Sequence, residues 1–319
     1  MEKAVFLNAA RLDFDGQLDF TPVSRQTQFT RYEDSDPVRI LERVRDHHTV
    51  ITKELPVGGE LIRNFPPTVK MICEAGTGYN NIDIAAAREK GIAVCNIPSY
   101  STDAVAQLVI TFILNLSASL PQQQAMLHRG DFSNFTRSLQ VPHRELGGKF
   151  LGIIGGGAIG QQVAAIARVL GMKVLLYSRT VKNWGDSGIQ SVSLEELLRT
   201  SDYVSLHCPL TDETRHLMDR QRLRLMKPSA CLINTARGAI VNETDLIAAL
   251  REGSIAGAAL DVQDPEPPDA ANPLFAMEQV ILTPHIGWRR LETRQRLVNL
   301  LGENIAAFLR GQPIHVVNR

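Results

Sequence analysis

Short apolar runs alternate with helical patterns along most of the chain, and this alternation constrains the fold more than any other feature. Helical spacing covers Ala158–Leu170, Ser193-Leu-Glu-Glu196 has the form of a capping box, and Asn242 is placed as the N-cap of a later helix. Short apolar strands between helices are typical of a parallel sheet covered on both faces. Six runs from residue 150 onward fit a doubly wound sheet: Phe150–Gly155, Lys173–Tyr177, Tyr203–Leu206, Cys231–Asn234, Ile255–Val262 and Val280–Thr283.

The first hundred residues repeat the alternation on a smaller scale. The segment Arg289–Arg310 reads as one long helix that ends at Gly311-Gln-Pro313. A chain of 319 residues is also longer than most single cores. We therefore predict two α/β domains, with residues 101–288 inserted into a smaller domain of residues 1–100 plus 289–319. In the smaller domain we expect strands at Val5–Leu7, Val50–Thr52, Val69–Cys73 and Ala93–Cys95, and helices around Ile40–Arg45 and Ile82–Lys90.

Charge and cysteine content argue against several classes of protein. Lys plus Arg and Asp plus Glu both total 34, so no net field favours nucleic acid or an anionic membrane. The first residues contain no apolar core of signal-peptide length, and we expect a cytoplasmic protein. No CxxC pair occurs, and we interpret the cysteines as reduced strand residues without disulfide or metal: Cys73, Cys95, Cys208 and Cys231.

One segment, Ala104–Leu120, is apolar nearly all round and raises the question whether the protein spans a membrane. Gln107 and Asn115 interrupt it, and it is shorter than the ~20 apolar residues that a membrane span needs. A helix that is apolar on all faces is usually buried. We predict a helix buried between domains or between subunits.

A glycine motif, Gly155-Gly-Gly157-Ala-Ile-Gly160, follows the first strand of the larger domain and opens a helix. In that context Gly155 would permit a tight turn, Gly157 would let the backbone approach a pyrophosphate, and Gly160 would let the helix pack on the strand. The helix N-terminus offers free N–H groups to phosphates. The motif favours dinucleotide binding over a tight turn that binds nothing.

Three later strands run into polar residues at their carboxyl ends, the edge where sites of such sheets lie. Arg237 follows the strand at 231–234, Glu266 follows the strand at 255–262, and His285 follows the strand at 280–283. Singly, each residue is more often a surface or structural residue. Together they place a cation, a carboxylate and an imidazole on one edge, which favours a catalytic site.

The same segments carry a resemblance to the D-isomer-specific 2-hydroxyacid dehydrogenases along nearly the whole chain. That resemblance implies a Rossmann dinucleotide-binding domain inserted into a smaller flavodoxin-like substrate domain, both doubly wound parallel α/β folds, and a homodimer held by the nucleotide domains. The similar segments are EAGTGYNNID (74–83), NIPSYSTDAVAQ (96–107), LGIIGGGAIG (151–160), LHCPLTDETRHL (206–217), INTARGAIVNETDLIAAL (233–250), ALDV (259–262), DPEPP (264–268) and TPHIGW (283–288).

The resemblance also implies a role for each catalytic candidate. Arg237 would bind the substrate carboxylate and keto oxygen, and His285 would protonate the developing alkoxide during reduction. Glu266 would hydrogen-bond the other imidazole nitrogen of His285 and favour the charged ring. The residues expected to contact substrate are Gly76, Thr77, Gly78, Arg237, His285 and Trp288, with the loop at 76–78 holding the carboxylate from the opposite domain.

Cofactor contacts are expected from the motif and the resemblance together, with Asp261 accepting from the nicotinamide carboxamide and Thr102 and Val105 lying on the inter-domain side. The full expected set is Thr102, Val105, Gly155, Gly157, Ala158, Ile159, Gly160, Ser178, Arg179, Cys208, Pro209, Thr214, Thr235, Ala236, Arg237, Asp261 and His285. No metal ligand is expected.

With Trp288 after His285-Ile-Gly, the sequence at this point resembles the family branch that contains glycerate dehydrogenase and hydroxypyruvate reductase. An aromatic residue beside the acid would narrow the pocket toward small acids such as hydroxypyruvate and glyoxylate. Some relatives with this fold act instead as dinucleotide-sensing corepressors, and retained catalytic residues do not exclude that alternative. The absence of basic or low-complexity segments argues against it.

Cofactor choice depends on the end of the second strand of the larger domain. NAD-preferring domains usually place Asp or Glu there to bind the ribose 2′-OH. Here the strand ends in Ser178-Arg179-Thr180, with no acid before Asp186. Ser178 could donate to a 2′-phosphate and Arg179 could pair with it. We predict a preference for NADP(H), with NAD(H) as the alternative.

Overall fold

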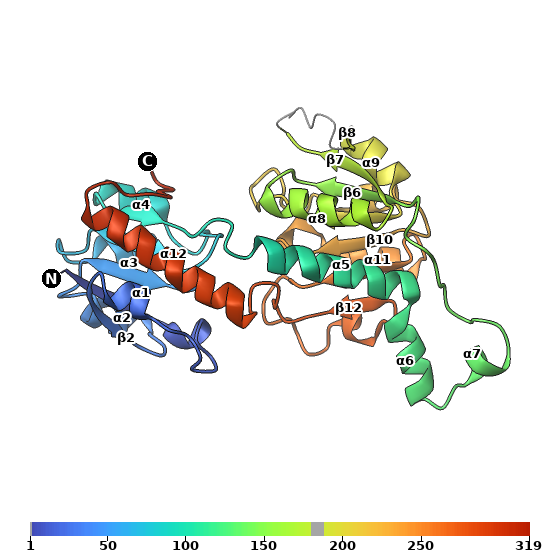
Figure 1. Ribbon diagram of the computed structural model, residues 1–319, viewed down its shortest axis with the longest axis horizontal. Helices are drawn as coiled ribbons and strands as arrows, with labels where there is room; N and C mark the ends of the chain where they lie inside the picture. Colours follow the sequence, from blue (N-terminus) through green and yellow to red (C-terminus); the bar gives the residue numbers. More distant parts are fainter. Residues whose placement is uncertain (1, 180–187) are drawn as a thin grey trace. The chain divides into compact units, whose positions relative to one another are not determined.

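A computed structural model describes residues 2–179 and 188–319, and the chain divides into two compact units. The first unit holds residues up to Ser101 together with Trp288–Arg319, and the second holds Thr102–Gly287 (Figure 1). The boundaries expected from the sequence were 100/101 and 288/289. Thr180 and Asp186, on which the predicted cofactor preference partly depends, lie outside the described residues.

The first unit contains a five-stranded parallel sheet in the order β2-β1-β3-β4-β5. This is the flavodoxin-like order, in which the connections reverse direction between β1 and β3. The strands are β1 Lys3–Phe6, β2 Gln28–Arg31, β3 Thr49–Thr52, β4 Met71–Glu74 and β5 Ala93–Cys95.

Two apolar layers cover the faces of this sheet, because alternate strand residues point to opposite sides. Ala4 and Phe6 of β1 pack in the core beneath α1 and α12, whereas Val5 packs in the core beneath α2, α3 and α4. The C-terminal helix α12 therefore belongs to the first unit (Figure 1). The helices are α1 Thr21–Ser24, α2 Pro37–Arg43, α3 Gly59–Arg63, α4 Ile84–Glu89 and α12 Leu291–Leu309, with a 3₁₀ turn at Ala9–Arg11.

The second unit contains a seven-stranded parallel sheet in the order β12-β11-β10-β9-β6-β7-β8. Its connections reverse direction between β6 and β9, so ligand sites are expected at the carboxyl ends of these two strands. The strands are β6 Phe150–Ile154, β7 Lys173–Tyr177, β8 Ile189–Ser191, β9 Tyr203–Leu206, β10 Cys231–Asn234, β11 Gly257–Leu260 and β12 Val280–Leu282.

Helices cover both faces of the second sheet. On one face α5 packs against α8, β10 and β11, and on the other α9, α10 and α11 pack over a second core. Ser193 and Asn242 cap α9 and α11 as predicted, because each side chain accepts a backbone N–H three residues on. The helices are α5 Thr102–Ala118, α6 Leu120–His128, α7 Ser133–Thr136, α8 Ala158–Val169, α9 Leu194–Thr200, α10 Arg220–Leu223 and α11 Glu243–Arg251, with 3₁₀ turns at Gly238–Ile240 and Pro273–Ala276.

The structure corrects several details of the sequence prediction. Each sheet has one more strand than predicted, because β2 and β8 are short, partly polar edge strands without an apolar run. The strand predicted at 255–262 spans only Gly257–Leu260. Cys208, interpreted as a strand residue, lies in the loop after β9, and all four cysteines are free thiols.

The helix predicted at 104–120 is also only partly as expected. In α5 most apolar residues are buried, but Gln107, Thr111 and Leu114 form an exposed stripe. Among the described helices, none alone is long and apolar enough to cross a membrane. Taken together, α5 and α6 pass that test of length and composition, and they are bent by 58° at their junction.

Candidate active site

The glycine turn after β6 has the geometry that requires glycine at two of its positions. Gly155 has φ of +111°, and a Cβ there would lie 2.6 Å from the backbone nitrogen of Cys208 in the loop after β9. A Cβ on Gly160 would lie 2.3 Å from the carbonyl oxygen of Gly155. The turn and the first residues of α8 are therefore packed against each other and against the neighbouring loop.

Gly157 is different, because no atom of the residues that the structure describes lies within 4 Å of the position that its Cβ would take. It is the N-cap of α8, in an extended conformation that any residue can adopt. In the described part of the chain, the amide N–H groups of Ala158, Ile159 and Gly160 donate to no protein acceptor. The turn thus presents an open cradle and free donors, which suits a pyrophosphate.

The loop after β9 is fixed by its own hydrogen bonds. The hydroxyl of Thr214 donates to the carbonyl oxygen of Pro209 at 2.7 Å and accepts from the N–H of Thr211 at 2.8 Å. From this loop Glu213 forms an ion pair with Arg179, which follows β7. Both side chains are largely exposed. The cation that was predicted to recognise a 2′-phosphate therefore already has a carboxylate partner.

Arg237 lies on a braced loop after β10. Asn234 accepts from the N–H of Ala236 at 3.0 Å, and its side-chain amide donates to the carbonyl of Arg237 at 2.8 Å. A Cβ on Gly238 would lie 2.0 Å from the carbonyl oxygen of Gln263, so the loops after β10 and β11 are in backbone contact. The guanidinium of Arg237 donates to Ala236 through Nη1 and has no carboxylate partner among the described residues.

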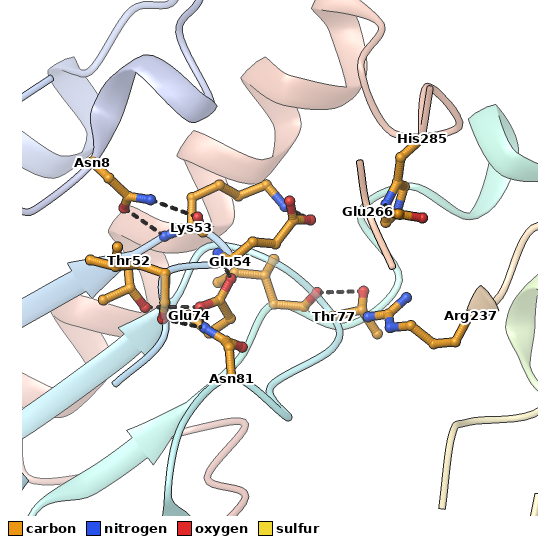
Figure 2. Close-up of polar contacts among 12 residues, drawn as sticks. Asn8, Thr52, Lys53, Glu54, Glu74, Thr77, Asn81, Arg237, Glu266 and His285 are labelled. Carbon is orange, nitrogen blue, oxygen red and sulfur yellow. Dashed lines mark hydrogen bonds and ion pairs between the residues drawn. The ribbon is translucent and has the colours of Figure 1, made fainter. Parts of the chain in front are cut away.

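His285 and Glu266 face each other across the loops after β12 and β11 (Figure 2). The Nδ1 atom of His285 lies 2.9 Å from Oε2 of Glu266, and Oε1 of Glu266 accepts from the N–H of Gln263 at 2.9 Å. The side chain of His285 is 22% exposed. Because Nδ1 is held, Nε2 is the imidazole atom left for a substrate.

Asp261 holds the loop that carries His285. Its carboxylate accepts from the hydroxyl of Thr283 at 2.6 Å and from the N–H groups of Ile286 and Gly287 at 2.7 and 2.9 Å. His285 itself has φ of +52°, and its N–H donates to the carbonyl of Asp261 at 2.8 Å. Burial raises the pKa of Asp261, and the hydrogen bonds from Thr283 and the loop amides oppose that rise. The carboxylate keeps one acceptor position for the predicted nicotinamide contact.

In the first unit, the loop after β4 presents a row of amide donors. Among the described residues, the N–H groups of Gly76, Thr77 and Gly78 have no protein acceptor. The carbonyls point elsewhere, because Ile97 donates its N–H to Gly76 at 2.8 Å and Asn96 donates its side-chain amide to Thr77 at 2.7 Å. Successive unpaired N–H groups form a nest that can bind an anion. We call residues 76–78 the amide nest.

The remaining predicted residues occupy varied positions. Thr102 begins α5, and Val105 is buried one turn later. The hydroxyl oxygen of Thr235 is buried and has no partner among the described residues, so it remains able to bind a ligand. Trp288 belongs to the first unit, where it is 6% exposed in the core beside α12. Its expected role as a wall of the substrate pocket stays a prediction.

Comparison with known proteins agrees with this geometry. Residues 110–287 match the family model described as D-isomer specific 2-hydroxyacid dehydrogenase, NAD binding domain. A hydroxypyruvate reductase of Blautia hydrogenotrophica is 36% identical over 317 residues, which are 98% of this chain and 97% of that protein. The chain belongs to the D-isomer-specific 2-hydroxyacid dehydrogenase family.

Two further similarities support the same conclusion for this dehydrogenase. A glyoxylate reductase of Thermococcus litoralis is 41% identical over 287 residues, which are 88% of this chain and 86% of that protein. The crystal structure of D-lactate dehydrogenase from Aquifex aeolicus complexed with NAD and lactic acid has a TM-score of 0.86 at 28% identity and covers 99% of both chains. The dehydrogenase therefore uses a nicotinamide dinucleotide.

Sequence reasoning missed one group of polar residues in the dehydrogenase, at the carboxyl edge of the first sheet. Lys53 and Glu74 are almost completely buried there, with Asn8, Thr52 and Glu54 around them (Figure 2). The signal was available, because Lys53 follows an apolar strand just as Arg237 does in the second unit.

Proposed function

We propose that this dehydrogenase reduces a small 2-keto acid, hydroxypyruvate or glyoxylate, to the corresponding 2-hydroxy acid. The observation that carries the proposal is the contact between His285 Nδ1 and Glu266 Oε2, at the same sheet edge as Arg237 and the glycine turn. Relatives named hydroxypyruvate reductase and glyoxylate reductase support the choice of substrate. In this proposal the second unit binds the dinucleotide and the first binds the substrate carboxylate.

The chemistry of reduction divides among few residues. When bound, the dinucleotide supplies the hydride. Arg237 binds and polarises the keto group through guanidinium N–H groups that pair with no carboxylate of the described residues. His285, oriented by Glu266, holds a proton at Nε2 and donates it to the alkoxide oxygen as the carbonyl is reduced.

The amide nest completes the proposal by binding the substrate carboxylate. Three N–H donors can satisfy both carboxylate oxygens without a side chain, and backbone donors lose little entropy on binding. A carboxylate held in this way leaves the neighbouring keto carbon as the reactive position. This fits 2-keto acids better than simple aldehydes or ketones, which offer no anion.

The test is the oxidation of NADPH and NADH at 340 nm with hydroxypyruvate, glyoxylate, pyruvate, 2-ketoisocaproate and phenylpyruvate. We expect kcat/KM for hydroxypyruvate or glyoxylate to exceed that for phenylpyruvate by at least about tenfold, a difference that loss of fit in a small pocket can supply. A higher kcat/KM for phenylpyruvate than for hydroxypyruvate and glyoxylate would contradict the proposal that the substrate is small. Tight dinucleotide binding without turnover of any acid would favour the corepressor-like alternative.

We propose further that NADP(H) is the preferred cofactor. The cradle at Gly157 and the free amides of α8 suit the pyrophosphate of either dinucleotide. Arg179 supplies a cation after β7, and its exposed ion pair with Glu213 is weak enough to be exchanged for a doubly charged 2′-phosphate. A lone 2′-OH would leave the Arg179–Glu213 pair in place.

Cofactor preference is tested by kcat/KM for NADPH against NADH in three variants. Arg179→Ala and Ser178→Asp should shift preference toward NADH, Ser178→Asp more strongly because it adds repulsion. Glu213→Gln should shift preference toward NADPH, because it frees Arg179. A wild-type enzyme that favours NADH tenfold, or a Glu213→Gln variant that moves toward NADH, would show the proposal to be wrong.

We propose that the dehydrogenase is a homodimer in the cytoplasm, where its thiols stay reduced. Support comes from exposed apolar side chains gathered on α6, α7 and the segments beside them: Leu120, Phe132, Phe135 and Leu139. Phe135→Asp should convert the dimer to a monomer in sedimentation velocity. Val38→Asp, at an equally exposed residue of the first unit, should remain dimeric. A monomeric wild-type protein would contradict the proposal.

A further inference from the structure

Lys53 is a buried cation at the topological switch point of the first sheet. It follows β3, next to Asn8, which follows β1, and the sheet connections reverse direction between these two strands. The side chain of Lys53 is only 2% exposed. Ligands of open α/β sheets bind outside the carboxyl ends of the strands at such a point. A buried lysine is rare enough there to require a reason.

The backbone around Lys53 is firmly held. Asn8 accepts from the N–H of Lys53 at 2.9 Å and donates to its carbonyl at 2.7 Å. The ammonium donates to Glu54 Oε1 at 2.5 Å and lies 4.0 Å from the centre of the Trp288 ring. The aromatic face and the carboxylate thus fix the position of one positive charge.

Glu74 brings an opposite charge into the same place. Its carboxylate is fully buried and accepts from the Thr52 hydroxyl at 2.8 Å, the Asn81 amide at 2.9 Å and the N–H of Glu54 at 2.8 Å. Burial raises the pKa of Glu74, and the charge of Lys53 is the strongest influence that opposes the rise. A buried carboxylate without a nearby cation would be costly.

Both charges lie close to Gly76, the first residue of the amide nest. A Cβ on Gly76 would lie 3.3 Å from Oε1 of Glu74 and 3.5 Å from Nζ of Lys53. An anion bound at the nest would therefore be repelled by the carboxylate of Glu74 and attracted by the ammonium of Lys53. Without Lys53, the field of Glu74 would repel the anion that the nest is built to hold.

We infer that Lys53 sets the affinity of the nest for a substrate carboxylate by offsetting the charge of Glu74. Lys53 is in this sense a positioning residue, because it acts through the nest and does not touch the reacting atoms. The inference rests on the proposed function, in which the nest binds a 2-keto acid. It adds that substrate affinity depends on the balance of the Lys53 and Glu74 charges.

The experiment measures KM and kcat for glyoxylate and hydroxypyruvate in Lys53→Met, Glu74→Gln and the double variant. Lys53→Met should raise KM about 10- to 100-fold, as expected for one nearby charge in a partly shielded site, with kcat changed less than about threefold. Glu74→Gln should lower KM, and the double variant should return KM to within about threefold of wild type. Dinucleotide affinity should stay unchanged throughout.

Lys70→Met is the matched control. Lys70 is exposed and immediately precedes β4, at the end of that strand opposite to Glu74. Its KM should equal that of the wild type. A double variant that keeps the high KM of Lys53→Met would overturn the inference, because Lys53 would then act by shape or direct contact. An unchanged KM in Lys53→Met would overturn it as well.

The KM of Glu74→Gln and the activity of the wild-type enzyme separate the remaining outcomes. If Lys53→Met does not fold, Glu74→Gln alone decides, since loss of a merely structural carboxylate would not lower KM. A wild-type enzyme that reduces no 2-keto acid would contradict the proposed function itself. Wild-type turnover with the wrong response of these variants would contradict only the inference about Lys53.

Discussion

Two glycines of the β6–α8 turn should respond in opposite ways to the same substitution. At Gly160 an added Cβ would lie 2.3 Å from the carbonyl oxygen of Gly155 and 3.1 Å from Cγ2 of Ile153. At Gly157 the same Cβ would meet no atom within 4 Å in the described part of the chain. Gly160→Ala should therefore destabilise the second unit, and Gly157→Ala should leave its stability unchanged.

The magnitude for Gly160→Ala follows from two opposing terms. Alanine is favoured over glycine in a helix by about 1 kcal/mol, which would stabilise α8. The contact with a backbone carbonyl requires the helix to move, and overpacking of this kind costs about 1–3 kcal/mol or more. We expect the clash to exceed the gain by about 1–2 kcal/mol and to lower Tm by roughly 2–8 °C.

Dinucleotide binding separates the two variants further. The open space at Gly157 is where a pyrophosphate would approach the backbone, so Gly157→Ala should weaken binding of both NADPH and NADH at least about tenfold. The assay combines thermal unfolding of the free protein with calorimetric titration of each dinucleotide. Gly157→Ala with wild-type affinity would refute the assignment of this turn to the pyrophosphate. A rise in Tm for Gly160→Ala would refute the packing argument.

Three further predictions concern the catalytic loop and the buried carboxylates. His285→Ala should lower kcat for keto-acid reduction about 10²- to 10⁴-fold with unchanged NADPH affinity. Glu266→Gln should lower kcat by a smaller factor. Equal losses in kcat and in NADPH affinity in His285→Ala would contradict a proton-donor role for His285. Thr283→Val removes the hydroxyl donor to buried Asp261 and should cost about 1–3 kcal/mol in a urea titration, whereas an unchanged midpoint would show that this bond contributes nothing. Because the folded-state pKa of Glu74 is raised above its ordinary value of 4.5, the folded state binds more protons than the unfolded state above that pH, and stability falls as pH rises. The stability of wild type relative to Glu74→Gln should therefore decrease between pH 4.5 and 7, and an increase would contradict the direction of the shift.

Most strands of the second unit could be predicted from the sequence, because its buried parallel strands carry continuous apolar runs. Strand β10, for example, is buried along its whole length and was recognised as Cys231–Asn234. The edge strands β2 and β8 lack this signal, since their side chains are partly exposed and polar. Pairing with a neighbouring strand, not local sequence, makes them strands.

The candidate site followed the same pattern. The carboxyl-edge rule led from the strands to Arg237, Glu266 and His285, and the structure brings Glu266 and His285 into contact. Applied to the first sheet, that rule would also have indicated Lys53. The same rule would have indicated Glu74, which directly follows the strand predicted at Val69–Cys73 and is the last residue of β4. The sequence could not show that the Glu74 carboxylate is buried close to the Lys53 ammonium, because that depends on tertiary structure. The ion pair between Arg179 and Glu213 joins loops after different strands and depends on tertiary structure.

The most direct test of the proposed reaction is the chirality of the product formed from hydroxypyruvate by the purified protein. NADPH oxidation at 340 nm gives the rate, and chiral separation of the glycerate gives the isomer. Hydroxypyruvate-dependent oxidation that yields D-glycerate, and that falls at least about 100-fold in His285→Ala, is the predicted result. No oxidation with hydroxypyruvate or glyoxylate and either dinucleotide, or formation of L-glycerate from hydroxypyruvate, would contradict the account.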